Sequence, residues 1–237
     1  MRGSQKFFSI VAVSALVVVF LFSAPTIATA VTINLNAGDT INLATVINDG
    51  LSVQIGDKVF GDFSWDPNPA EPDMVAANVN VKALVNLNDI GFSLLFTQTW
   101  TTSDSKDIVF HYTVAVTDPS YLISDLHLSI TGTASGGSYA SVGETAYSSG
   151  IDNGQVGFVQ AFLFDGYPEL AASATNLDSL VTKLWITKDM NISGDGADTV
   201  SITAIDQTFS QIPEPSTVLL VSLGLLGVVA VNRKRKS

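Results

Sequence analysis

Apolar and polar residues alternate with a period of two through most of the chain between residues 50 and 210. The run from Ile108 to Val116 shows this clearly, because every second residue from Ile108 onward is large and apolar. Successive side chains of a β-strand point to opposite faces, so such a run makes a strand with one apolar face. Comparable runs are Val79–Leu87, Phe92–Trp100, Leu126–Ile130, Val156–Phe164, Leu180–Thr187 and Thr199–Phe209. They predict a mainly β fold, a single antiparallel β-sandwich, with a jelly roll or partly closed barrel as the alternative.

Turn signals separate these runs at hairpin spacing. Gly56-Asp57 joins Leu51–Ile55 to Lys58–Phe60 and predicts a hairpin. A short helix is expected over Ala44–Asp49, which Gly50 would end, and a weaker helical candidate is Leu170–Asn176. The segment Gln207–Glu214 reads as a linker, so we expect one domain over residues 31–211.

The N-terminal thirty residues have the three parts of a secretory signal peptide. Arg2 and Lys6 precede the apolar stretch Phe7–Phe22, and Ala28-Thr29-Ala30 supplies an A-x-A cleavage site. We expect a signal helix over residues 1–30 that is cleaved after Ala30. An uncleaved membrane anchor is the alternative.

The C-terminal end carries a second apolar segment. Pro213-Glu214-Pro215 is followed by a run from Val218 to Val231 and then by Arg233-Lys234-Arg235-Lys236. Proline delays the start of a helix, so a short transmembrane helix is expected over about residues 216–231, with a basic cytoplasmic tail. The positive charges at both ends place the intervening domain outside the cytoplasm. A plain tail anchor is the alternative to a sorting signal.

This C-terminal arrangement resembles a PEP-CTERM protein-sorting signal: the Pro213, Glu214 and Pro215 motif, an apolar helix, and the basic cluster at Arg233, Lys234, Arg235 and Lys236. A segment of this kind is also described as the C-terminal domain of ice-binding proteins. The resemblance covers residues 212–237. It implies export, recognition and cleavage near Pro213–Pro215 by an exosortase-like membrane transpeptidase, and delivery from the inner membrane to the cell surface or to an exopolysaccharide matrix. The segments Gly56–Phe60, Phe63–Trp65 and Phe209–Gln211 loosely resemble uncharacterised β-rich ectodomains that precede such signals.

The part of the chain between the two ends is strongly acidic. All 22 acidic residues lie between Asp39 and Glu214, and the basic residues there are Lys58, Lys82, Lys106, Lys183 and Lys188. Such a domain repels nucleic acid, whose binding depends on lysine and arginine contacts to phosphate. The chain has no cysteine, which excludes disulfides and thiol chemistry.

One segment matches the first half of a calcium-binding loop. Asp189, Asn191 and Ser193 stand at ligand positions 1, 3 and 5, with glycine next, and Asp195 could add a ligand. Val200 stands where the bidentate glutamate belongs. The competing interpretation is a hairpin turn between the strands Leu180–Thr187 and Thr199–Phe209, and no other cofactor is expected.

Catalytic motifs are not apparent. His111 and His127 lie on alternating runs without a third ligand at zinc spacing, and G-x-S-x-G does not occur. Thr97, Thr99 and Thr101 form one short row, which is too little for an ice-binding array. Three hypotheses remain: a non-enzymatic surface or matrix protein, a carbohydrate-binding or adhesive module with exposed aromatic side chains such as Trp65 or Trp100, and a secreted hydrolase with converging carboxylates. The first is preferred.

Overall fold

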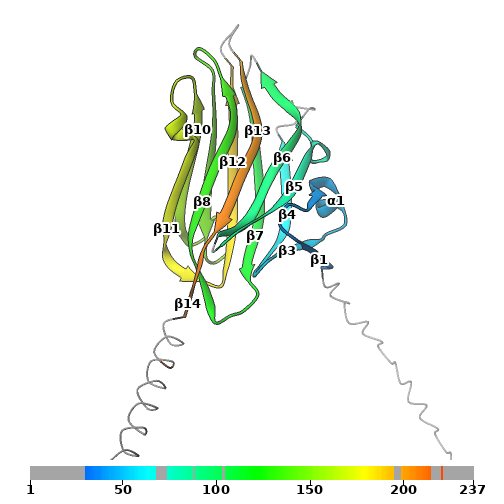
Figure 1. The fold of residues 1–237 in the computed structure, drawn as a ribbon, viewed down its shortest axis with the longest axis vertical. Coiled ribbons are helices and arrows are strands. Elements are labelled where there is room, and N and C mark those ends of the chain that lie inside the picture. Colours follow the sequence, from blue (N-terminus) through cyan, green and yellow to red (C-terminus); the bar gives the residue numbers. More distant parts are fainter. Residues whose placement is uncertain are drawn as a thin grey trace, which may run out of the picture.

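The structure is a computed structural model that describes residues 30–67, 74–87, 89–102, 105–194, 199–214 and 220, without the side chains of residues 67 and 98–102. Within these residues the chain is mainly β, and its strands form two seven-stranded sheets that curl around one core (Figure 1). The mainly β prediction is therefore confirmed, and the arrangement is that of a β-sandwich.

The first sheet has the strand order β1-β3-β4-β7-β12-β9-β10. Its strands are β1 (Thr32–Leu35), β3 (Ser52–Ile55), β4 (Lys58–Pro67), β7 (Ser105–Val116), β12 (Lys183–Ser193), β9 (Tyr139–Tyr147) and β10 (Gln155–Phe164). The second sheet has the order β11-β8-β13-β6-β5-β2, and β14 also pairs with β8. Its strands are β11 (Ala172–Val181), β8 (Tyr121–Ala134), β13 (Val200–Phe209), β6 (Asp89–Thr102), β5 (Val79–Asn86), β2 (Thr40–Asn42) and β14 (Gln211–Pro213).

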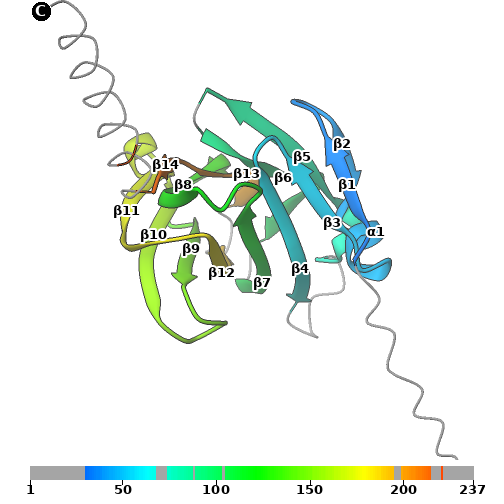
Figure 2. The same ribbon diagram turned by 90° about the horizontal axis from the view of Figure 1, so that it is seen from below.

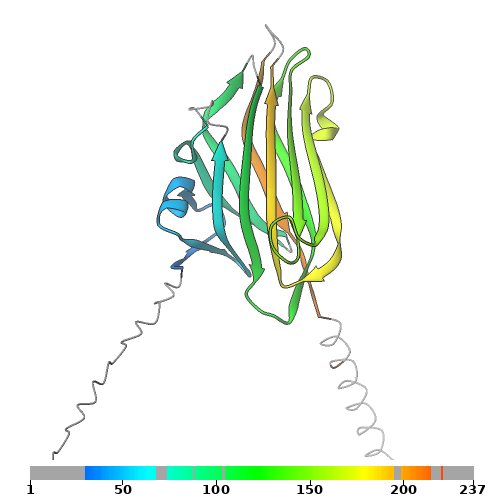
Figure 3. The same cartoon turned by 180° about the vertical axis from the view of Figure 1, so that it is seen from behind.

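The pairing of these strands is antiparallel, with one exception among the described residues. β1 runs parallel to β3, with Ile33 opposite Val53, so the expectation of a purely antiparallel sandwich is wrong at this edge. Between β4 and β13 the described chain forms the hairpins β5–β6 and β9–β10 and otherwise passes from one sheet to the other at each connection. Figures 2 and 3 show the resulting curl of the sheets from below and from behind.

Local signals in the sequence are partly confirmed. The β3–β4 hairpin turns at Gly56, whose φ of 55° suits a residue without Cβ, and the helix α1 spans Leu43–Asn48. The helix expected over Leu170–Asn176 is wrong, because only a 3-10 turn at Pro168–Ala171 precedes β11. The linker expected over Gln207–Glu214 is also wrong, since most of that segment belongs to β13 and β14.

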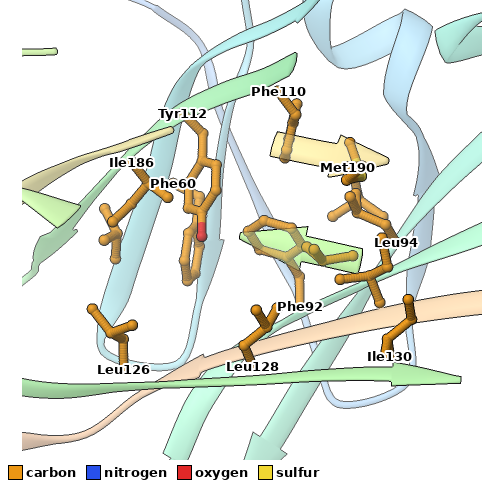
Figure 4. Close-up of a cluster of buried hydrophobic side chains, with 14 of the residues drawn as sticks. Phe60, Phe92, Leu94, Phe110, Tyr112, Leu126, Leu128, Ile130, Ile186 and Met190 are labelled. Atoms are coloured by element: carbon orange, nitrogen blue, oxygen red, sulfur yellow. The ribbon is translucent and has the colours of Figure 1, made fainter. Parts of the chain in front are cut away.

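The core between the sheets contains a cluster of aromatic rings from both sheets. Phe60 of β4 packs edge-on against Phe92 of β6, with ring centroids 5.2 Å apart, and Tyr112 of β7 approaches Phe92 at 5.1 Å. Figure 4 shows these rings facing Leu126, Leu128 and Ile130 of β8 and Ile186 and Met190 of β12. Aromatic pairs in such geometry add to the stabilisation that burial provides.

The two terminal helices predicted from the sequence lie outside the described residues. Neither the signal segment before Ala30 nor the apolar run Val218–Val231 can therefore be compared with the prediction. No helix within the described part of the chain is long and apolar enough to cross a membrane.

Candidate functional site

The start of the sorting motif is attached to the domain rather than separated from it. β14 pairs with β8 so that Ile212 lies opposite Leu122 and Pro213 opposite Tyr121. The backbone N–H of Glu214 then donates a hydrogen bond to the carbonyl oxygen of Ser120 at 2.8 Å. The contacts with the domain therefore extend at least to Glu214, within the motif itself.

Side chains just before the motif strengthen this attachment. Ser210 donates through its backbone N–H to Asp125 Oδ1 at 2.8 Å and through its hydroxyl to Asp89 Oδ1 at 2.6 Å. Gln211 Nε2 donates to Asp57 Oδ2 at 2.5 Å, and Gln211 Oε1 accepts from the fully buried Lys58 at 3.4 Å. Hydrogen bonds to charged groups are stronger than neutral ones, so this junction is well anchored.

The remaining predicted processing residues are largely outside the described part of the chain. Pro213 and Glu214 are described, whereas Pro215, Ala28 and the basic residues Arg233, Lys234, Arg235 and Lys236 are not. Ala30 is exposed, two residues before β1 begins at Thr32.

A charged and polar cluster lies in the core, between the two sheets. Lys188 of β12 and Glu144 of β9 stand directly opposite each other in adjacent strands, both with no exposed surface, and their side chains form an ion pair. From the other sheet, Gln207 of β13 turns its Oε1 toward Lys188 and accepts a hydrogen bond from Nζ at 2.9 Å. The Tyr112 hydroxyl donates to Glu144 Oε1 at 3.5 Å. We call Lys188, Glu144 and Gln207 the core triad.

The core triad is only partly satisfied. Gln207 Nε2 is buried and has no hydrogen-bond partner. Burial raises the pKa of the Glu144 carboxyl, which Lys188 only partly offsets, and burial lowers the pKa of the Lys188 amine against the opposing effect of Glu144. Both shifts disfavour the charged forms of the two groups, whereas their mutual attraction favours those forms.

Sequence reasoning missed this cluster, although a signal for it exists. Lys188 occupies the same alternating phase as Leu184, Ile186, Met190 and Ile192, all of which are fully buried. Glu144 likewise alternates with Ala140, Val142 and Ala146 in β9, a strand that the apolar pattern did not reveal. A charged residue in the inward phase of a strand is the signal that could have identified the cluster.

Three residues of the calcium-loop interpretation lie in a strand rather than in a loop. Asp189, Asn191 and Ser193 belong to the extended strand β12, which is paired on both sides, and Asp195 lies outside the described residues. Residues of a strand at alternate positions share one face but cannot wrap around an ion as a loop does. The hairpin-turn interpretation is wrong for the same three residues.

The histidines do not form a metal cluster. His111 Nδ1 lies 3.0 Å from the Thr187 hydroxyl, and His127 Nε2 lies 3.4 Å from Asp125 Oδ1. Among the described residues there is no group of three His, Cys, Asp or Glu side chains that could hold a metal ion.

Surface depressions of ligand size bring few carboxylates together. One of about 400 Å³ is lined by His127 and Asp206, and another of about 350 Å³ by Phe164, Asp165 and Tyr167. A third, of about 410 Å³, includes Trp185, whose ring has Lys183 Nζ 4.8 Å from its centroid. None of the three has two carboxylates in its described lining.

A row of partly exposed aromatic rings lies on the outer face of β9 and β10. Tyr139 stacks on Phe164 with centroids 5.5 Å apart, and Phe162 stacks on Phe164 at 5.9 Å. Phe158, further along β10, is 50% exposed. We call Tyr139, Phe158, Phe162 and Phe164 the aromatic row. It was not predicted, because an alternating strand does not reveal which apolar face stays uncovered.

The two tryptophans that the sequence suggested as sugar-stacking residues, Trp65 and Trp100, are not part of the aromatic row. Trp65 is half-buried, packs on Phe110 and donates through Nε1 to the Met74 carbonyl oxygen at 2.9 Å. Trp100 lies among the side chains outside the described residues, as do Thr99 and Thr101.

Comparisons with known proteins agree with the C-terminal motif. The family model of the PEP-CTERM protein-sorting motif matches residues 211–236, which confirms the resemblance to a sorting signal and implies export with exosortase processing. No curated protein matches the chain.

Two solved structures show weak similarity to the domain. TmCBM61 in complex with β-1,4-galactotriose is 11% identical, with a TM-score of 0.33 over 65% of this chain and 89% of that chain. Accessory secretory protein 1, 2 and 3 of Streptococcus pneumoniae is 10% identical, with a TM-score of 0.28 over 60% of this chain and 94% of that chain. Similarity at this level assigns no activity.

Proposed function

We propose that this chain is an exported, non-enzymatic protein that an exosortase-like membrane transpeptidase delivers to the cell surface or to an exopolysaccharide matrix. The observation that carries the proposal is the sorting motif at residues 211–236, at the end of a folded acidic domain. Before processing, the protein is anchored in the inner membrane by its C-terminal helix, with the domain outside the cytoplasm.

The positions of the first and last strands support this topology. β1 and β14 both lie at the lower end of the sandwich in Figure 1, so the chain enters and leaves the domain at the same end. A domain whose N-terminal signal segment and C-terminal helix engage the same membrane during export is compatible with this arrangement.

The experiment is to replace Pro213 and Glu214 by alanine and to follow the protein in fractions of its own cells. We expect the wild-type chain to shorten and leave the membrane fraction, and the variant to accumulate there at full length. Glu169→Ala, in the exposed turn before β11, is the matched control and should process normally. Equal processing of the motif variant and the control would contradict the proposal.

A second candidate function, binding of a polysaccharide, is favoured by the aromatic row. Flat rings exposed on a sheet can stack on the apolar faces of sugar rings, and the depression lined by Phe164, Asp165 and Tyr167 adjoins one end of the row. Polar residues Thr131 and Thr133 also line that depression and could bind sugar hydroxyls.

This candidate is tested by electrophoresis through gels that contain the exopolysaccharide of the producing cells. We expect the wild-type domain to be retarded and a Phe158→Ala, Phe164→Ala double variant to migrate freely. Leu87→Ala serves as the control, since Leu87 is 96% exposed on the β5–β6 turn, outside the aromatic row. Unchanged retardation of the double variant would remove the aromatic row as the binding surface.

A further inference from the structure

The core triad joins the two sheets through three groups whose chemistry is complementary. Lys188 carries a primary amine, Gln207 a carboxamide and Glu144 a carboxyl group, and all three side chains have no exposed surface. Lys188 and Glu144 belong to adjacent strands of one sheet, whereas Gln207 comes from β13 of the other. A covalent bond from Lys188 to Gln207 would therefore tie the two sheets together.

The contacts place the amine beside the carboxamide. Lys188 Nζ lies 2.9 Å from Gln207 Oε1 and is also in contact with the Glu144 carboxylate. Gln207 Nε2 is buried without a hydrogen-bond partner. A buried unpaired amide nitrogen is costly, and that cost disappears if the nitrogen leaves the protein.

We propose that Lys188 and Gln207 form an intramolecular isopeptide bond in the folded protein, with Glu144 transferring the proton. The Lys188 Nζ lone pair attacks Gln207 Cδ, the Nζ–Cδ bond forms, and the Cδ–Nε2 bond breaks. One proton of the neutral amine stays on the new amide. The other passes through the Glu144 carboxyl group to Nε2, which leaves as ammonia, so no oxidant, metal or further reactant is needed.

The surroundings meet the requirements of this reaction. A lysine is nucleophilic only when its amine is neutral, and burial away from water favours that form, as does the lowered pKa of Lys188. Burial raises the pKa of Glu144, which suits a group that must take up and give back a proton during the reaction. The dry core also excludes the water that would hydrolyse the product.

The bond would give an exported domain a covalent link without cysteine. The chain contains no cysteine, so a disulfide cannot connect the sheets. The link would close a loop of the chain between Lys188 of β12 and Gln207 of β13. Such a loop lowers the conformational entropy of the unfolded state, as a disulfide does.

Mass spectrometry of the full-length chain tests the proposal. We expect a mass lower by one ammonia molecule than the sequence predicts. Cleavage after lysine and arginine together with cleavage before aspartate should then yield residues 184–188 joined to the peptide that begins at Asp206. A Glu144→Gln variant should show the unreduced mass, and Glu169→Gln, an exposed control in the turn before β11, should retain the link.

Other outcomes would overturn the proposal. An unreduced mass in the wild-type chain would show that the triad is an ordinary buried ion pair. Loss of one water molecule, with residues 184–188 joined to a peptide containing Glu144, would place the bond between Lys188 and Glu144 instead. Loss of ammonia with Lys58 joined to Gln211 would show that the isopeptide bond forms at that pair and not between Lys188 and Gln207. Each of these results comes from the wild-type chain, so the test does not depend on the folding of a variant.

Discussion

The backbone N–H of Glu214 and the carbonyl oxygen of Ser120 are joined by a hydrogen bond of 2.8 Å, which continues the pairing of β14 with β8. The first part of the sorting motif is thus held as an edge strand of the folded domain. A processing enzyme must bind the chain around Pro213–Pro215 as an accessible peptide. Release of β14 from β8 is therefore expected to precede processing, as a local opening of the sheet.

Insertion of a short Gly-Ser segment between Gln211 and Ile212 should increase the rate of processing several-fold. The insertion would move the motif beyond the pairing with β8 while leaving the side-chain contacts of Gln211 in place. Pulse-chase labelling of the precursor measures this rate. The control is the same segment inserted after Leu87, in the exposed β5–β6 turn. Equal processing rates in the two insertion variants would show that β14 does not limit access of the enzyme to the motif.

Phe60→Ala should lower the free energy of unfolding of the exported domain by about 3–5 kcal/mol. Phe60 is fully buried and contacts the rings of Phe92, Tyr112 and Phe209, so its loss leaves a cavity between the sheets. Denaturant unfolding of residues 31–214 measures the change. Phe158→Ala should cost much less, because that ring is 50% exposed. Similar losses in both variants would contradict the assigned core.

Gly91→Ala should destabilise the domain by about 1–3 kcal/mol or more, because overpacking forces backbone shifts. A Cβ at Gly91 of β6 would lie 1.7 Å from the Gln207 carbonyl oxygen of β13. At Gly143 a Cβ would meet only the Phe158 ring, at 3.6 Å, so Gly143→Ala is the matched control in a strand. Thermal unfolding of the two variants checks the prediction, and a Gly91→Ala protein as stable as the control would disprove the close β6–β13 contact.

Asp189→Asn should make the domain more stable at neutral pH. Burial and the neighbouring Asp107 carboxyl raise the pKa of Asp189 above its ordinary value of 3.8. Because the pKa of Asp189 is higher in the folded state than in the unfolded state, protonation of its carboxyl group favours folding. The contribution of protonated Asp189 to stability is complete below the unfolded-state pKa and is lost as the pH rises through the folded-state pKa. Because solvent screens the partly exposed pair, the gain at neutral pH should be no more than about 1 kcal/mol.

Unfolding measured across the acidic range tests the sign of this effect. Asp118→Asn is a useful contrast, because the hydrogen bond from the backbone N–H of Ser120 lowers the pKa of Asp118. The contribution of ionised Asp118 to folding stability is therefore lost as the pH falls. The stability of wild-type protein and Asp189→Asn should diverge above pH 3.8. Parallel curves for the two proteins would show that the Asp107–Asp189 repulsion is absent.

Much of the fold follows from local pattern. The alternation over Ile108–Val116 and Thr199–Phe209 predicts β7 and β13, and Gly56-Asp57 predicts the β3–β4 turn. The sorting motif is likewise readable as an ordered set of residue types. These features depend on neighbours in the chain, whose spacing is visible in the sequence.

The strand partners are not readable in this way. β12 lies between β7 and β9, and β13 between β6 and β8, although these strands are far apart in the chain. Backbone hydrogen bonds are the same for every residue type, so alternation indicates a strand without naming its neighbour. Two strands are also hard to recognise locally, because the inward residues of β9 are mostly small or charged and β14 has only three residues.

The sequence by itself determined that the chain forms strands with one apolar face and that it carries a sorting motif at its C-terminal end. Only the tertiary structure decided that Lys188, Glu144 and Gln207 meet inside the core, because their proximity comes from three strands in two sheets. The physical reason is that burial is a collective property. A charged side chain is removed from water only when other strands close over it, and only then do its partners and its reactivity become defined.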